Sequence, residues 1–529
     1  MSEDDAAPVT TTDDAAGRIA AGYATAGPAV ELGAVMHDGR PHPGAAVRVP
    51  LAMLNRHGLI AGATGTGKTK TLQLLAEQLS AAGVPVVVAD IKGDLSGLAR
   101  AGTPGDRITQ RAAQTGDQWQ PTAYPVEFLA LGGLGTGVPV RCTLTDFGPL
   151  LLSKVLDLNA TQESSLGLIY HYADGAGLPL LDLQDLRAVV QWLLSDEGKP
   201  ELKNLGGLST ATAGVILRKL IALAELGGDV FFGEPEFDPA DLMRTAEDGR
   251  GVVTAVELAA VQDRPALFST FLMWLLAELF EELPEVGDVD KPKLVFFFDE
   301  AHLLFSNASK AFLESVTQTV RLIRSKGVGI FFVTQNPTDV PSAVLGQLGN
   351  RVQHALRTFT PEDATALRKT VSTFPRTADY DLEELLTGLG IGEAAVTVLS
   401  DRGTPTPVAW TMLRAPRSLM APIEPAAMAE AVRSSPLQAK YGQPVDRDSA
   451  YERLAARVSP SRPTPDAELP ENAERSTPRR RAAPAPPSEE GGLSRVLESP
   501  VFRSFARSAA SALGRELTRG LFGTRRRRR

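Results

Sequence analysis

Cysteine is nearly absent from this chain of 529 residues, because Cys142 is the only one. A single cysteine excludes an intramolecular disulfide and a cysteine-based metal cluster. The six histidines show no H-E-x-x-H or similar spacing, so a common zinc motif is missing as well. These absences favour a protein of a reducing compartment.

Long apolar runs are also missing. No stretch reaches the roughly 18 to 20 unbroken apolar residues that a membrane-spanning helix requires. The first residues, MSEDDAAPVTTTDDAAG, are acidic and lack the basic region and apolar core of a signal peptide. We therefore expect a cytoplasmic protein.

The chain as a whole has no excess of positive charge, since its net charge is −9. Residues 491–529, however, hold ten arginines and two glutamates, a net charge of +8 that leaves −17 for the remainder. A basic arm on an acidic body is one way to contact DNA or a membrane surface. The apolar fraction of 43% is sufficient for a sizeable core.

The apolar pattern predicts an α/β fold with a mostly parallel sheet. Residues 57–61 (HGLIA) and 84–91 (VPVVVADI) are typical of buried strands, and a stretch with leucines at helical spacing lies between them. Further strands are predicted at residues 252–258, 294–298, 330–334 and 352–356, with a terminal hairpin formed by 396–399 and 407–412.

Shifts in composition divide the chain into six parts. They are a disordered acidic N-terminus (1–28), the first part of the α/β core (29–98), a mainly helical insertion (99–250), the second part of the core (251–432), a Pro-rich linker (433–492) and a basic amphipathic helix with an arginine tail (493–529). The last part has apolar residues at spacings of three or four beside its arginines, which suits a membrane surface or a partner groove. An unstructured, solubilising tail is the alternative.

Residues 62–69 (GATGTGKT) fit the P-loop pattern G-x-x-x-x-G-K-[ST] without a mismatch. The glycines let backbone N–H groups point at phosphates, and the following helix adds its positive N-terminal end. Lys68 is expected on the β- and γ-phosphates of ATP, and the Thr69 hydroxyl on Mg²⁺. A Gly/Thr-rich turn that binds nothing is the alternative, which the flanking strand and helix disfavour. The predicted ATP-binding residues are Gly62, Thr64, Gly65, Thr66, Gly67, Lys68, Thr69 and Lys70.

Two carboxylates follow a predicted buried strand in residues 293–300 (KLVFFFDE). In a P-loop enzyme the first acid, Asp299, holds Mg²⁺ through its water shell. The second, Glu300, orients and deprotonates the attacking water. Capping of a helix that begins at Ala301 is the alternative. Downstream of a complete P-loop we favour the catalytic interpretation, which indicates hydrolysis and not binding alone.

Gln335 ends the next predicted strand, where it is placed to contact the γ-phosphate or the attacking water; an ordinary polar turn is the alternative. Asp90 has a similar position, and its neighbours Lys92 and Asp94 form either part of the site or a surface turn. The candidates for an arginine finger that reaches a neighbouring subunit's ATP are Arg321, Arg324, Lys326 and Arg351. A solvated helix face is the alternative for each, and Arg324 is kept among the predicted catalytic residues.

Together these motifs resemble the HerA/FtsK superfamily of hexameric DNA-pumping ATPases. The resemblance spans residues 56–411 and is carried by RHGLIAGATGTGKT, DIKGD, FFFDEAH, RSKGVGIFFVTQNPTDVP and NRVQHALRTFTPED. Within the superfamily the chain is similar to the bacterial "helicase HerA-like" proteins, a group with a domain of unknown function. The resemblance implies a RecA-like core, a ring of six subunits, ATP at subunit interfaces and double-stranded DNA in the channel.

The family pattern carries over to individual residues as well. It places Lys68, Thr69, Asp299, Glu300 and Gln335 in the nucleotide site. The trans-acting arginine of the superfamily falls at Lys326, with Arg324 two residues earlier, and lysine lacks the planar fork of arginine. The favoured function is an ATP-driven DNA translocase or helicase-like motor. The alternative is an ATP-dependent switch or assembly ATPase that acts on a protein or membrane partner.

Overall fold

The computed structural model describes residues 12–202, 206–287, 289–305 and 310–458. These residues divide between two units. Among the described residues, the sheet unit draws on residues 12–141, 225–231 and 235–445, and the helical unit on residues 142–224, 232–234 and 446–458. The predicted C-terminal helix and arginine tail at 493–529 lie outside the described residues.

A single sheet of twelve strands forms the centre of the sheet unit. Its order is β2-β1-β12-β11-β10-β3-β9-β8-β4-β7-β5-β6. The strands are β1 Ala29–His37, β2 Arg40–Pro50, β3 Gly58–Ala61, β4 Val86–Asp90, β5 Val126–Leu131, β6 Val138–Val140, β7 Val253–Glu257, β8 Leu294–Phe298, β9 Val328–Thr334, β10 Asn350–Gln353, β11 Glu393–Thr397 and β12 Ala409–Leu413.

The sheet is parallel from β10 to β6 and antiparallel from β10 to β2. Every residue of the central strands β3, β4, β8 and β9 is buried. Their runs of Val, Ile and Phe suit strands that are covered on both faces. The predicted α/β class with a mostly parallel sheet is therefore confirmed.

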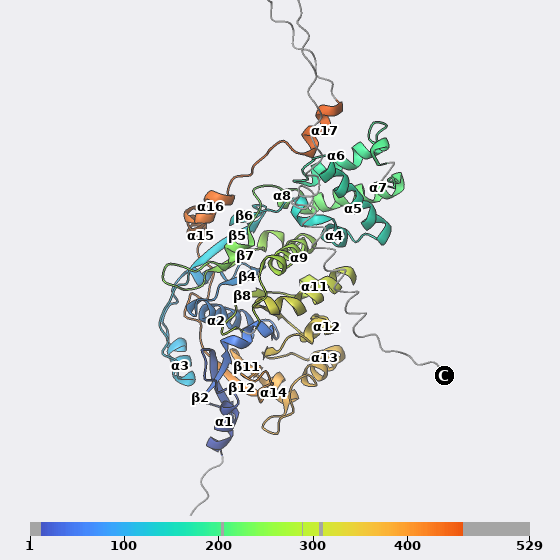
Figure 1. Ribbon diagram of the computed structural model, residues 1–529. Coiled ribbons are helices and arrows are strands. Elements are labelled where there is room, and N and C mark those ends of the chain that lie inside the picture. Colours follow the sequence, from blue (N-terminus) through green and yellow to red (C-terminus); the bar gives the residue numbers. More distant parts are fainter. Residues whose placement is uncertain (1–11, 203–205, 288, 306–309, 459–529) are drawn as a thin grey trace, which may run out of the picture. The chain divides into compact units, whose positions relative to one another are not determined.

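Helices cover both faces of this sheet (Figure 1). They are α1 Thr12–Ala21, α2 Lys68–Ala81, α3 Asp106–Thr115, α8 Asp229–Phe231, α9 Pro265–Glu282, α10 His302–Phe305, α11 Lys310–Ile323, α12 Ser342–Leu345, α13 Pro361–Val371, α14 Leu382–Gly388, α15 Pro425–Ser434 and α16 Pro436–Tyr441. Phe297 and Phe331 belong to the core cluster that also holds the leucines of α2. On the other face the ring of Phe332 lies 5.5 Å from those of Phe298 and of Phe305 on α10. Alternate strand residues thus anchor different helices.

The helical unit consists of α4 Leu144–Val155, α5 Ala160–Gly175, α6 Leu183–Leu194, α7 Thr210–Leu223 and α17 Ala450–Val458. Asn159 and Asp182 begin α5 and α6 with capping boxes, in which a side chain satisfies free backbone N–H groups of the first turn. At the start of α17 the Ser449 hydroxyl donates to Asp185 of α6 at 2.5 Å. A segment more than 250 positions along the chain thereby completes this unit.

The predicted strands and the terminal hairpin of β11 and β12 are present. Three boundaries differ from prediction. The expected insertion at 99–250 begins with β5 and β6, which belong to the sheet, so the helical unit starts at residue 142. The expected disordered N-terminus contains α1, whose Ala16 and Ile19 are buried. The expected linker from 433 begins with α16 and α17. Short helices and edge strands carry a weak periodic signal, and long-range packing decides them.

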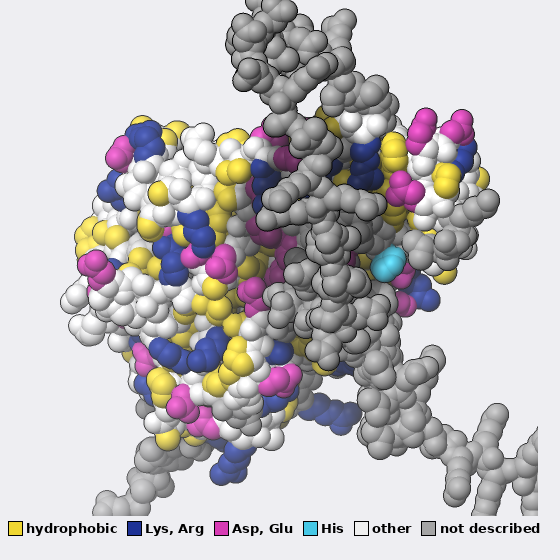
Figure 2. Space-filling view, turned by 45° about the horizontal axis from the view of Figure 1, so that its top comes forward, with side chains coloured by type: hydrophobic (Ala, Val, Ile, Leu, Met, Phe, Trp, Pro, Cys, Tyr) yellow, Lys and Arg dark blue, Asp and Glu magenta, His cyan; other side chains and the backbone are white. Residues whose placement is uncertain are grey.

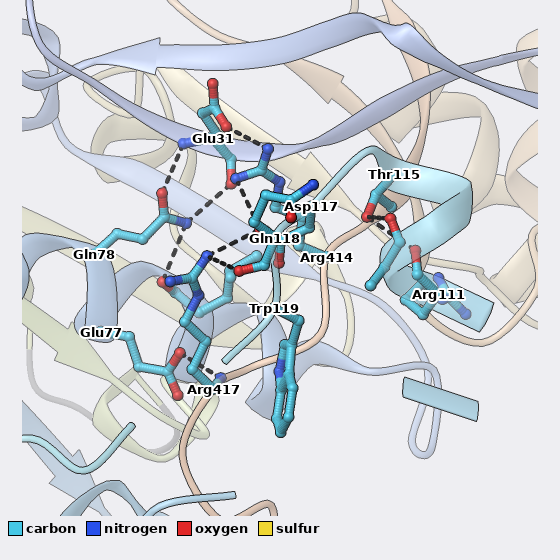
Figure 3. A network of polar contacts seen from close by, with 12 residues as sticks. Glu31, Glu77, Gln78, Arg111, Thr115, Asp117, Gln118, Trp119, Arg414 and Arg417 are labelled. Atoms are coloured by element: carbon cyan, nitrogen blue, oxygen red, sulfur yellow. Dashed lines mark hydrogen bonds and ion pairs between the residues drawn. The ribbon is translucent and has the colours of Figure 1, made fainter. Parts of the chain in front are cut away.

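Residues 414–419, which follow β12, cross the helix α2; we call this segment the strap (Figure 3). Glu77 of α2 accepts the backbone N–H groups of Arg417 at 2.8 Å and Ser418 at 2.9 Å, and the Ser418 hydroxyl. The Arg417 guanidinium also donates to Asp117 at 2.9 Å. The helix that follows the P-loop is therefore held from its side by buried polar contacts.

Candidate nucleotide-binding site

The predicted site residues come together at one edge of the sheet. β3 leads into the P-loop, β8 ends just before Asp299, β9 ends just before Gln335, and β4 ends at Asp90. These strands are parallel neighbours in the order β3-β9-β8-β4. Because the carboxyl ends of parallel strands meet at the same edge, Lys68 and Asp299 share this site although they are 231 positions apart.

The P-loop curls from β3 into α2 through left-handed glycines. Gly62 has a φ of 151°, and a Cβ there would lie 2.5 Å from the Cβ of His354. Gly67 begins α2 with a φ of 113°. Any larger residue at either position is strained, so the loop conformation depends on glycine. Thr64 and Gly65 are exposed at the tip of the loop.

Lys68 turns back onto its own loop. Its Nζ donates to the carbonyl oxygens of Gly62 at 2.7 Å and Ala63 at 3.2 Å. Burial lowers the pKa of Lys68, with Lys92 acting in the same direction, while Glu300 and Asp299 oppose the change. An ammonium therefore lies inside the loop that is to hold phosphates, close to the two carboxylates.

Residues far along the chain support the P-loop, and the sequence did not single them out. Ala63 N–H donates to Ala355 O at 2.8 Å, and Gly392 N–H donates to Thr66 O at 3.1 Å. His354, which follows β10, shares a 2.8 Å hydrogen bond between its Nε2 and the Thr71 hydroxyl. Burial lowers the pKa of His354 to about 4, so its ring is neutral. The only sequence signal was a histidine within the strand predicted at residues 352–356.

Asp299 lies at the end of β8 with a buried carboxyl group, whose Oδ2 has no hydrogen-bond partner among the described residues. Burial raises the pKa of Asp299 to about 7, although Lys92 opposes the change. A buried carboxylate oxygen with no partner is costly unless a cation or donor satisfies it. This position suits a Mg²⁺ ligand.

Glu300 has a backbone φ of 47°, in the left-handed region. Its Oε1 forms an ion pair with Lys92 Nζ, and its Oε2 lies 3.1 Å from His302 Nδ1. Burial favours the protonated acid, but the contacts with Lys92, followed by the charges of His302 and Lys68, hold the pKa of Glu300 below its usual value. The predicted base is therefore ionised and held by cations.

Asp90 turns towards its own loop. Its carboxylate accepts the backbone N–H groups of Gly93 at 2.7 Å, Asp94 at 3.3 Å and Leu95 at 2.9 Å. Asp90 therefore serves to close the turn, which is one of the two predicted alternatives. Lys92 of the same turn contacts Glu300. Glu257, at the end of the neighbouring β7, is a further buried carboxyl group at this edge that the sequence did not indicate.

Gln335 is exposed directly after β9, between the P-loop strand and the Asp299 strand. The turn behind it is closed by Asp339, which accepts the Thr334 hydroxyl at 2.7 Å and the Asn336 N–H at 3.0 Å. Gln335 therefore lies at the edge where the P-loop and Asp299 meet, and its contact with a phosphate or the attacking water stays a prediction.

A family model described as "Helicase HerA-like C-terminal" matches residues 36–529. The chain belongs to this family. The predicted resemblance to the HerA/FtsK superfamily is thereby confirmed. No curated protein matches the chain.

Two solved structures illustrate what this chain is similar to. The bacterial conjugative coupling protein TrwB is 16% identical to this HerA-like chain, with a TM-score of 0.51, and the match covers 78% of this chain and 94% of that one. VirB4 of Thermoanaerobacter pseudethanolicus is 16% identical, with a TM-score of 0.47 and coverage of 74% and 98%. Two of the TrwB structures are complexes with non-hydrolysable GTP and ATP analogues.

The arginine-finger candidates of this HerA-like chain lie in different surroundings. Arg321 and Arg324 are exposed beside the start of β9, at the sheet edge opposite the P-loop. β9 has seven residues, about 20 Å of extended chain, so neither arginine is placed to act on its own P-loop. Lys326 is only 12% exposed, 3.9 Å from Glu285 and above the Phe280 ring. Arg351 donates to Thr373 O at 3.3 Å.

The described residues contain no group of three or more His, Cys, Asp or Glu side chains arranged to hold a metal. A Mg²⁺ ion in a nucleotide site needs fewer protein ligands, because phosphate oxygens and water complete its shell. Asp299 and the Thr69 hydroxyl in the first turn of α2 fit that requirement. Within the described part of the chain, no helix is long and apolar enough to span a membrane.

Proposed function

We propose that this protein binds ATP with Mg²⁺ and hydrolyses it. The observation that carries the proposal is the meeting of the P-loop, the buried Asp299 and the ionised Glu300 at one edge of a parallel sheet. A site for binding alone would not need a carboxylate beside the metal ligand. The family membership and the nucleotide complexes of TrwB support the same reading.

In this proposal the P-loop N–H groups and the N-terminal end of α2 hold the β- and γ-phosphates. Lys68 leaves the carbonyl oxygens of Gly62 and Ala63 to contact the phosphates. Thr69 and Asp299 would hold Mg²⁺, which when bound neutralises charge on the phosphate oxygens. The exposed Thr64 and Gly65, together with Thr66 and Lys70, complete the loop around the nucleotide.

Hydrolysis then needs a water aligned with the γ-phosphorus. Glu300 accepts a proton from that water. The water oxygen attacks the γ-phosphorus, and the bond from this phosphorus to the bridging oxygen of ADP breaks. Gln335 hydrogen-bonds the water or a γ-phosphate oxygen. Lys68 neutralises charge that develops on the leaving ADP.

Two substitutions test this assignment. Lys68→Ala removes the ammonium from the loop, and we expect loss of ATP binding or turnover. Glu300→Gln keeps the size of the side chain and removes the base, so we expect unchanged ATP affinity and a turnover number lower by about 100-fold or more. Fluorescent-nucleotide titration and steady-state phosphate release measure the two quantities. Normal hydrolysis by Glu300→Gln would show that another group is the base.

We further propose that hydrolysis drives a ring-shaped DNA translocase or helicase-like motor. Membership of the HerA-like family supports this role, as does the coupling-protein name of TrwB. An ATP-dependent switch or assembly ATPase also fits the same site. On the face shown in Figure 2, Lys and Arg side chains lie among acidic and apolar ones and do not form one basic patch. Charge on that face therefore favours neither role.

The ATPase rate with and without double-stranded DNA separates the two roles. A rate that depends on Glu300 and rises with DNA supports the motor. A rate that depends on Glu300 and ignores DNA supports the switch, and a pull-down with the Glu300→Gln variant loaded with ATP then searches for a protein partner.

The basic residues 491–529 lie outside the described residues and enter this proposal by their charge alone. Phosphate contacts by their arginines would make binding to DNA or to anionic lipid sensitive to salt. Deleting 491–529 and measuring binding to duplex DNA and to anionic vesicles distinguishes the two. Loss of neither would return this segment to a solubilising tail.

A further inference from the structure

A basic side chain lies beside each oxygen of the Glu300 carboxylate. Lys92 pairs with Oε1, and His302 Nδ1 lies 3.1 Å from Oε2. The Glu300 side chain is 6% exposed, whereas that of Lys92 is 43% exposed. A general base must direct a free lone pair at the water that it deprotonates. In this structure the Lys92 ammonium therefore competes with an attacking water for Oε1.

The turn that carries Lys92 is rigid. The Asp90 carboxylate accepts hydrogen bonds from the backbone N–H groups of Gly93, Asp94 and Leu95. Gly93 adopts a φ of 71°, which favours glycine. Lys92 lies inside this turn, so its direction is set by the backbone. Contact with Glu300 therefore does not depend on a freely moving surface loop.

The backbone at Glu300 indicates that its conformation is imposed. A φ of 47° is unfavourable for a residue with a Cβ, and such conformations persist only where surrounding contacts maintain them. The ion pair with Lys92 and the contact with His302 are contacts of that kind. Removing the ion pair leaves Glu300 free to move towards a more favourable backbone and towards water.

A second acceptor for Lys92 lies in its own turn. Asp94 Oδ1 is buried and has no hydrogen-bond partner among the described residues. Burial opposes the charge on Lys92, but Glu300 and Asp299, and after them Asp94, raise its pKa. A buried carboxylate oxygen without a partner is stabilised by a nearby ammonium. The Asp94 carboxylate is thus an alternative partner for the Lys92 ammonium when the ion pair with Glu300 opens.

We propose that Lys92 is a positioning residue that withholds Glu300 from the attacking water, and that its transfer to Asp94 releases the base. The inference rests on the proposed ATP hydrolysis. It identifies a control point inside each subunit, formed by the turn after β4 and the end of β8. Turnover is slow while the Lys92–Glu300 pair is intact and rises when the pair opens.

Substitutions with opposite expected effects test the proposal. Lys92→Met removes the ammonium and keeps most of the stem, and we expect the turnover number to rise by about threefold to tenfold with unchanged ATP affinity, because one partly buried ion pair is lost. Lys92→Arg keeps the charge and should stay near wild type. Asp94→Asn removes the negative charge that would attract the Lys92 ammonium, and should lower the turnover number by a similar factor.

Controls separate this effect from others. Lys199→Met removes an exposed lysine that pairs with Asp196 in the helical unit, and should change nothing. The double variant of Lys92→Met with Glu300→Gln should be inactive, because the released group is Glu300. Affinity for a fluorescent ATP analogue is measured for each variant, so that turnover and binding are read separately.

The outcomes distinguish the two proposals. If wild type hydrolyses ATP through Glu300 and Lys92→Met is no faster, or slower, Lys92 does not withhold the base and only this inference is wrong. An unchanged turnover number in Asp94→Asn overturns the role given to Asp94. If wild type and Lys92→Met both bind ATP without hydrolysing it, the proposed hydrolysis fails and this inference with it.

Discussion

Glu257 illustrates how the site edge changes the chemistry of a single residue. It ends β7 beside Asp90, its Oε1 is buried, and that oxygen has no partner among the described residues. Burial, followed by the charge of Asp90, raises the pKa of Glu257 from 4.5 to about 8. The unfolded chain releases this proton near the ordinary value, while the folded protein retains it. The stability that protonated Glu257 contributes is thus complete below about pH 4.5 and is lost as the pH rises to about 8.

Glu257→Gln therefore should stabilise the protein at alkaline pH. We expect a gain in the free energy of unfolding on the order of 3 to 5 kcal/mol at about pH 8, shrinking to near zero at about pH 4.5. Urea unfolding of the full chain across this range measures the difference. Glu314→Gln, at a side chain that is 69% exposed, is the matched control. A gain that does not vary with pH would contradict the buried proton.

Among the elements, α2 links the nucleotide site to the rest of the sheet unit through two adjacent residues. Glu77 holds the strap, and the Gln78 amide pairs with the backbone N–H and C=O of Glu31 in β1, at 2.8 and 2.9 Å (Figure 3). One helix is thus tied to two different segments of the unit. Because Glu77 accepts three donors in a buried position, its loss leaves those donors unsatisfied.

Glu77→Ala tests the strap. We expect a loss of about 2 to 3 kcal/mol in stability and faster hydrogen exchange in residues 414–419. Gln78→Ala on the same helix removes the contact to β1 and should leave exchange in the strap unchanged. Equal exchange in the strap for both variants would mean that Glu77 does not hold it.

At the scale of the whole molecule, the position of Arg324 decides which nucleotide site it can reach. Arg324 is exposed at the sheet edge opposite its own P-loop. A role in catalysis is therefore open to Arg324 only on the ATP of another subunit. Lys326, predicted from the family pattern to be the equivalent residue, packs against Phe280 of its own chain.

Mixing inactive variants tests cooperation between subunits. Lys68→Ala keeps Arg324 and lacks a working P-loop, while Arg324→Ala keeps the P-loop. If Arg324 acts in trans, we expect each variant to be nearly inactive alone and a mixture to regain part of the ATPase rate. Lys68→Ala mixed with Glu300→Gln should regain none, because both changes affect the same half of the site. No recovery in the first mixture would rule out Arg324 as the finger.

The P-loop and the Asp299–Glu300 pair were predictable from the sequence because each is a run of adjacent residues with its own physical requirement. Glycines, a lysine and a hydroxyl form a phosphate-binding loop where a strand and a helix flank them. Buried strands are recognised by their runs of apolar residues. The α/β class and the positions of most strands along the chain followed from the same local patterns.

Tertiary structure alone decided which distant residues meet. Lys92 and Glu300 are 208 positions apart and come together because β4 and β8 are neighbours in the sheet. His354 and Gly392 support the P-loop because β10 pairs with β3, and β11 pairs with β10, in the same sheet. Strand direction likewise decides at which edge of the sheet Arg321 and Arg324 lie. Such contacts depend on strand order and register, which local periodicity does not encode because it records only which face of each element is buried.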